Sequence, residues 1–146
     1  MSDSADIAAR FQNLATRLLR QARLIDEGSR LTSAQYSALS TLYNFPGLSV
    51  TELAHKEYVS HPTMSRIIAA LIKQGLVVRD VAETDGRVFT LTLSDEGAAA
   101  YQRVYARRLA LLGALLGRLK PETIADLLQA FESLPSSILT DRDMRS

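Results

Sequence analysis

Apolar residues recur at helical spacing along most of the chain. Residues 6–26 carry one long stripe of this kind, and residues 32–46 and 49–57 carry two shorter ones. Each shorter stripe opens with the spacing of a capping box, Thr32 with Gln35 and Ser49 with Glu52. The pattern therefore predicts one long helix followed by two short ones.

A fourth helix is predicted over residues 60–75. Ser60 is a good N-cap, Pro62 lies in the first turn, where its missing N–H does no harm, and Gly75 suits the left-handed position after the end. One face is apolar and should meet a core: Met64, Ile67, Ile68, Leu71 and Ile72. The other face is small or basic and contains no acid: His61, Thr63, Ser65, Arg66, Ala69 and Lys73.

The connection between the third and fourth helices is very short, which is typical of a helix-turn-helix. An outer face of short hydrogen-bonding groups with one arginine suits a DNA major groove. A solvated helix face with two cations is the alternative interpretation, and the helix alone does not decide between them.

The hydrophobic period changes after Gly75. Residues 76–81 and 87–93 are rich in strand-forming side chains, and Asp85-Gly86 lies in the turn-forming stretch between them. This predicts a two-stranded hairpin, a wing, directly after the helix-turn-helix. Two more helices are expected, one capped by Ser94 and one beginning near Pro121. Their apolar faces, with that of the first helix, need a partner surface.

Composition narrows the class of protein. The chain has 146 residues, enough for one domain with a real core, and its 47% hydrophobic and 23% charged residues are an ordinary globular balance. No apolar run is long enough to cross a membrane, and the acidic start is unlike a signal peptide, so we expect a cytoplasmic protein. Cysteine is absent, which excludes thiol chemistry. The net charge is only +1, so any affinity for DNA must come from local charge.

Catalytic and metal chemistry find little support. The chain has no nucleophile elbow, phosphate loop or carboxylate constellation, so we expect no enzyme and no cofactor. Glu52 and His55 have a spacing seen in metal sites, but such sites need three or four donors, and we expect no metal. A helical protein-interaction module without sequence-specific DNA binding is the alternative function. It would explain the apolar outer helices but not the wing.

Four motifs together resemble the MarR family of bacterial transcription regulators. They are the Ser-x-Pro-Thr-x-Ser-Arg start at 60–66, Leu-x-x-x-Gly-Leu-Val-x-Arg at 71–79, Asp85-x-Arg87, and Leu-Thr-Leu-Ser-x-x-Gly at 91–97. The resemblance implies a mainly α fold with a small β-hairpin wing, that is, a winged helix-turn-helix with long flanking dimerisation helices. Residues 1–30 and 94–146 would form the dimerisation part and residues 31–93 the DNA-binding lobe of one intertwined domain. It also implies a homodimer, a repressor more than an activator, on a pseudo-palindromic operator in double-stranded DNA.

The expected DNA-contacting residues follow from these motifs: Ser60, His61, Pro62, Thr63, Ser65, Arg66, Lys73, Arg79, Asp85 and Arg87. In the family each wing directs an arginine toward the minor groove, a position that Arg87 occupies, with Asp85 to orient its guanidinium. The alternative is a surface salt bridge at the hairpin. The family often has a second arginine where this chain has Gly86, so its wing carries less charge.

The family is usually switched by a small-molecule effector that binds between the dimer helices and the DNA-binding lobe. Phe11, Arg17, Tyr36 and Tyr43 are the expected lining of such a cleft. The alternative, that these aromatic side chains are simply core, stays open and is the one we prefer.

Overall fold

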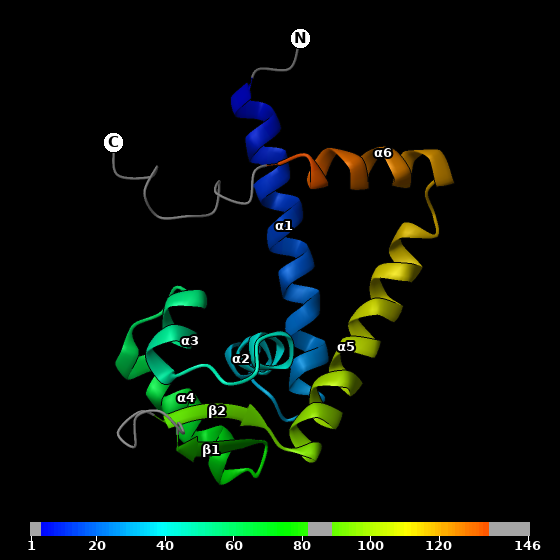
Figure 1. Ribbon diagram of the computed structural model, residues 1–146. Helices are drawn as coiled ribbons and strands as arrows, with labels where there is room; N and C mark the ends of the chain where they lie inside the picture. The colour runs from blue at the N-terminus through cyan, green and yellow to red at the C-terminus, as the bar shows by residue number, and fades with distance from the viewer. Residues whose placement is uncertain (1–3, 82–88, 135–146) are drawn as a thin grey trace. The chain divides into compact units, whose positions relative to one another are not determined.

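A computed structural model describes residues 4–81 and 89–134 (Figure 1). The elements are α1 (Ser4–Glu27), α2 (Ser33–Asn44), α3 (Val50–Lys56), α4 (His61–Lys73), β1 (Val77–Val81), β2 (Phe89–Leu93), α5 (Asp95–Leu116) and α6 (Pro121–Glu132). The chain divides into two compact units, residues 1–108 and 109–146. The expected mainly helical chain with a small hairpin is confirmed.

Both predicted capping boxes are present. The Thr32 hydroxyl accepts the backbone N–H of Gln35 at 3.1 Å, and the Gln35 side chain accepts the N–H of Thr32 at 2.9 Å. Ser49 and Glu52 make the same reciprocal pair at the start of α3. Helices α2 and α3 therefore begin where the local sequence places their caps.

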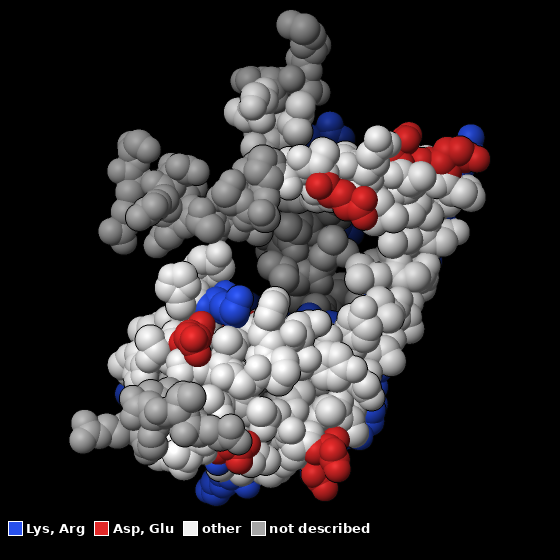
Figure 2. Space-filling model, viewed as in Figure 1, with Lys and Arg blue, Asp and Glu red and all other residues white. Residues whose placement is uncertain are grey.

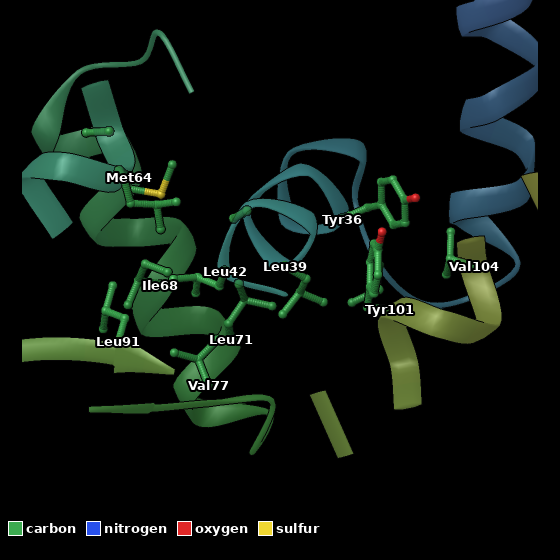
Figure 3. Packing of buried hydrophobic residues seen from close by; sticks show 14 residues of the cluster. Tyr36, Leu39, Leu42, Met64, Ile68, Leu71, Val77, Leu91, Tyr101 and Val104 are labelled. Carbon is green, nitrogen blue, oxygen red and sulfur yellow. The ribbon is translucent and has the colours of Figure 1, made fainter. Parts of the chain in front are cut away.

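The core of the first unit lies between α2, α4 and the hairpin (Figure 3). Leu39 and Leu42 of α2 meet Ile68 and Leu71 of α4, and Leu91 of β2 completes the cluster. All five are almost fully buried, and burying a side chain of this size stabilises a fold by about 1.5–3 kcal/mol. The core thus fixes which face of α4 points outward.

Tyr43 departs from the expected pattern. Our preferred interpretation of the sequence made it a core residue, as it did Tyr36, but Tyr43 is 43% exposed. Its ring lies 4.7 Å from that of Tyr101, and its hydroxyl accepts a hydrogen bond from Gln102 at 3.0 Å. A tyrosine side chain can pack its ring against the core while its hydroxyl stays at the solvent-exposed surface. Tyr43 therefore lies at the rim of the core.

The hairpin pairs in antiparallel register from Val77 opposite Leu93 to Val81 opposite Phe89. The turn after α2 also joins it: Gly47 donates to the Leu91 carbonyl at 2.9 Å, and the Leu91 N–H donates to Leu48 at 2.8 Å. Strand β2 is therefore hydrogen-bonded along both of its edges, to β1 on one side and to the turn between α2 and α3 on the other.

A buried ion pair joins α1, α2 and α5 inside the first unit. Asp26 is only 1% exposed, and its two carboxylate oxygens accept Nη2 of Arg108 at 2.7 and 2.8 Å. Ser33 donates to the same carboxylate at 2.8 Å, and the Arg108 guanidinium lies 3.7 Å from the centroid of the Tyr36 ring. Removing one partner of such a pair lowers the free energy of unfolding by about 3–5 kcal/mol, because the other charge is left buried without a partner.

The start of α5 is packed against the turn that ends α4. Gly75 has φ of 73°, as predicted for its left-handed position, and its carbonyl accepts the Ser94 hydroxyl at 2.6 Å. Ser94 also accepts the N–H of Gly97 at 3.0 Å, as expected of a cap. A Cβ on Gly97 would lie 1.9 Å from the Leu76 carbonyl oxygen, so only glycine fits there.

The described part of the second unit exposes its apolar side chains. Leu112 of α5 is 42% exposed, and α6 buries none of its residues within the described chain. Figure 2 shows mostly uncharged surface over α6, with acidic groups at its borders. No helix among the described residues is both long and apolar enough to span a bilayer.

Gly97→Ala should lower the free energy of unfolding by about 1–3 kcal/mol or more, because the new methyl group has to displace backbone rather than a flexible side chain. Gly28→Ala is the matched control, since its Cβ would meet atoms no closer than 3.6 Å. Urea denaturation at one fixed protein concentration measures both. Equal stabilities of the two variants would contradict the close approach of α5 to Leu76.

Candidate nucleic-acid interface

The outward face of α4 is set by the core behind it. Met64, Ile68 and Leu71 are buried, which leaves the opposite side of the helix to solvent. Most of the predicted DNA-contacting residues on α4 are exposed: His61, Pro62, Thr63, Arg66 and Lys73. Ser65 is half-buried, so its hydroxyl is less accessible than the others.

The N-terminus of α4 carries two short hydroxyl side chains, those of Ser60 and Thr63. The exposed Ser60 is the N-cap, and its hydroxyl accepts the Thr63 N–H at 3.3 Å and lies 2.8 Å from the Thr63 hydroxyl. The helix dipole adds partial positive charge at this end. Such an end readily holds a DNA phosphate.

The charges of α4 are all positive or neutral. Arg66 and Lys73 lie about two turns apart, and the helix has no acidic residue. The ion pairs among the described side chains join Arg10 to Asp6 and Arg108 to Asp26, so neither cation of α4 takes part in one. Neither cation is therefore paired with an acidic side chain of the described residues.

The hairpin carries one further predicted DNA-contacting residue among the described residues. Arg79 of β1 is exposed, and its guanidinium lies 5.1 Å from the centroid of the Phe89 ring on β2. A cation over an aromatic face is held in a preferred orientation. Asp85 and Arg87 lie outside the described residues, so their roles stay predictions from the sequence.

Glu57 is a residue that sequence reasoning missed. It ends α3 and accepts hydrogen bonds from two hydroxyls of α2, those of Ser37 at 2.5 Å and of Thr41. These contacts tie the turn before α4 to α2. In the sequence, Glu57 stands out only as an acidic residue in a turn with no other acid. Its partners could not be inferred, because Ser37 and Thr41 lie 20 and 16 residues away.

Tyr58 is the second missed residue. It has φ of 53°, a left-handed conformation that tyrosine rarely adopts, and it is 64% exposed in the turn before α4. The Tyr58 N–H donates to His55 at 3.3 Å, and the next N–H, of Val59, donates to Ala54 at 3.1 Å. The turn thus holds a large aromatic ring outward beside the N-terminus of α4.

The residues expected to line an effector cleft are divided between two environments. Tyr36 is buried and stacks on Tyr101 at 5.6 Å between ring centroids, and burial raises its pKa above the usual value. Tyr43 lies at the rim of the same stack. Phe11 and Arg17 are exposed on α1. Tyr36 is therefore core, as the alternative interpretation had it.

The Glu52 and His55 pair has a structural role at Glu52. The backbone N–H of Ser49, 2.8 Å from the carboxylate, and then the Ser49 side chain lower the pKa of Glu52. Residues 4–81 and 89–134 contain no cluster of three or more His, Asp, Glu or Cys side chains suited to a metal ion.

Comparison with known proteins gives a consistent result. A family model described as the MarR family matches residues 31–89. An HTH-type transcriptional regulator of Mycobacterium tuberculosis is 34% identical over 119 residues, which is 77% of this chain and 83% of that protein.

Solved structures show the same fold. A MarR family protein from Bacillus stearothermophilus aligns with a TM-score of 0.85 at 24% identity, over 93% of this chain and 95% of that chain. A MepR variant from Staphylococcus aureus, solved bound to an oligodeoxyribonucleotide, aligns with a TM-score of 0.68 at 21% identity, over 88% of this chain and 98% of that chain.

Glu57→Ala should lower the free energy of unfolding by about 1–3 kcal/mol, because it leaves the hydroxyls of Ser37 and Thr41 without their acceptor. Glu132→Ala is the control, an exposed acid at the end of α6 whose loss should change stability by less than about 0.5 kcal/mol. Denaturation midpoints measured together test the difference. Indistinguishable midpoints would mean that Glu57 does not anchor the turn.

Proposed function

Because the chain belongs to the MarR family of DNA-binding transcription regulators, we propose that it acts as a homodimeric repressor on a pseudo-palindromic operator. The observation that carries the proposal is the outward face of α4, which is polar, free of acids and headed by the Ser60 cap. The family consists of regulators rather than enzymes, and its relatives are named accordingly. We propose that it works in the cytoplasm.

In this proposal α4 enters the major groove. Arg66, one turn into the helix, reaches a base edge, because an arginine there can bind guanine in a bidentate manner. The hydroxyls of Ser60 and Thr63 contact phosphate, together with Lys73 at the far end and Arg79 on the hairpin. Arg87 extends to the minor groove with Asp85 beside it. The MepR variant shares this fold and was solved bound to an oligodeoxyribonucleotide, which supports DNA binding by a chain of this fold.

The dimer is proposed from the exposed apolar faces. Large apolar side chains of three helices are solvent-exposed in the single chain. They are Ile7, Phe11 and Leu14 of α1, Leu109 and Leu112 of α5, and Leu127, Leu128 and Phe131 of α6. Monomers rarely expose so many large apolar side chains together. A second copy of the chain would cover these side chains. No other protein partner is then needed to explain them, so the interaction-module alternative becomes unnecessary. We propose residues 1–30 and 94–146 as the dimerisation part and residues 31–93 as the DNA-binding lobe.

An effector is proposed to act at the tyrosine stack between α2 and α5. Tyr101 stacks with Tyr36 and Tyr105 and also contacts Tyr43, while Phe11 and Arg17 of α1 are exposed. A planar compound that pairs with the half-exposed Tyr43 would change the packing of α2 on α5. Because α2 belongs to the core that orients α4, such a change reaches the DNA-binding face.

Arg66→Ala should weaken operator binding by about 1–3 kcal/mol and relax base preference at one position of each half-site. Lys73→Ala is the comparison, expected to weaken binding equally on all sequences and to reduce the salt slope by about one. Genomic footprinting identifies the operator, and gel shifts at several salt concentrations measure affinity. Operator affinity within error of the parent for Arg66→Ala would exclude its base-reading role.

Leu112→Glu should convert the dimer to a monomer and thereby abolish operator binding, because it places an unpaired charge in the interface. Gln129→Glu adds the same charge to the polar side of α6, which also carries Glu122 and Asp126, and should leave the dimer intact. Sedimentation velocity at micromolar concentration gives the mass. A monomer mass for the parent chain would refute the dimer.

A further inference from the structure

A small cavity of about 180 Å³ lies in the first unit, and none of its lining residues belongs to α4. It is formed by the turn after α1 and by one side of α5, and it is lined by Gly28, Ser29, Arg30, Ala100, Arg103 and Arg107. Three of these residues are arginines and none is acidic. The residues expected for the effector cleft and the DNA face are not in this lining.

Two of the arginines come from α5. Arg103 and Arg107 are one turn apart, and like charges at this spacing disfavour the helix when nothing compensates them. The Nη1 atom of Arg107 lies 3.7 Å from the position that a Cβ on Gly28 would occupy, so its guanidinium lies over the turn. The turn and the helix face thus enclose the cavity from two sides.

The third arginine is fixed by the turn itself. Arg30 has φ of 65°, in the left-handed region that a residue with a branched or long side chain seldom adopts. The turn is held there by Ser29, whose N–H and hydroxyl both donate to the Asp26 carbonyl, at 2.8 and 2.6 Å. Unusual backbone of this kind is often associated with a functional site.

The carboxylate of Asp26, in the last turn of α1, does not pair with these arginines. Asp26 is engaged by Arg108 and Ser33, inside the core. Neither ion pair among the described side chains involves Arg30, Arg103 or Arg107. Side chains of three arginines therefore line one small pocket, and no described acidic side chain forms an ion pair with any of them.

We propose that this pocket binds a compact phosphate group, as inorganic phosphate or as part of a small phosphorylated molecule. Guanidinium groups bind phosphate oxygens in a bidentate manner, and three of them match a doubly charged anion. The cavity is smaller than the roughly 300–1,000 Å³ of pockets for drug-sized ligands, which favours a compact group. The bound anion would bridge the turn between α1 and α2 to α5.

The test is isothermal titration of inorganic phosphate into the full chain without DNA, at constant ionic strength set with chloride. The parent chain should bind phosphate saturably. The double variant Arg103→Gln with Arg107→Gln should bind it about ten-fold more weakly or worse, since charge-assisted hydrogen bonds are lost. Arg20→Gln with Arg23→Gln, two exposed arginines of α1, removes the same charge elsewhere and should bind like the parent.

A second double variant, Arg103→Lys with Arg107→Lys, keeps the charge and the fold but loses the planar fork, and should bind with intermediate affinity. Equal phosphate binding by the glutamine variant and the parent would overturn the proposal, as would absence of saturable binding in the millimolar range. The proposal would also be overturned if the parent did not bind phosphate while the glutamine variant bound DNA more weakly, with an affinity that depended less on salt concentration. That result would assign the arginines to the DNA backbone instead. None of these measurements depends on the assignment of Arg66 or of the dimer.

Discussion

The pair formed by Asp26 and Arg108 is the constraint on which the arrangement of the first unit depends. A carboxylate that is 1% exposed is tolerated only because a guanidinium and the Ser33 hydroxyl saturate it. These three groups belong to the end of α1, the start of α2 and α5. The pair therefore specifies one orientation for the helix that carries Tyr36 and the core leucines, and through that core it orients α4.

Local chemistry explains most of what the sequence predicted. Capping boxes, the Ser60 cap and Gly75 depend on residues three or four positions apart or on a single backbone conformation, so the pattern alone located the helices and the hairpin. The outer face of α4 followed from the same periodicity. The family motifs added the DNA-binding role, which a face of small and basic residues does not establish by itself.

Long-range contacts explain what the sequence did not predict. Arg108 lies 82 residues from Asp26, and Glu57 lies 20 residues from Ser37, so no spacing rule links them. Tyr43 sits at a helical core position but turns its hydroxyl to Gln102, 59 residues away. The left-handed Tyr58 has no signature at all, because tyrosine is neither glycine nor asparagine.

The hydrogen bonds along both edges of β2 have a consequence for solubility. A lone hairpin presents two open edges, either of which can add a strand from another molecule and start aggregation. Here the segment at Gly47 and Leu48 occupies one edge of β2, which leaves β1 as the outer edge of the described sheet. That strand is short and carries Arg79 and Asp80 in its middle, and charges at such a place discourage the approach of a foreign strand. The protein can thus expose a sheet edge beside α4 without inviting intermolecular pairing.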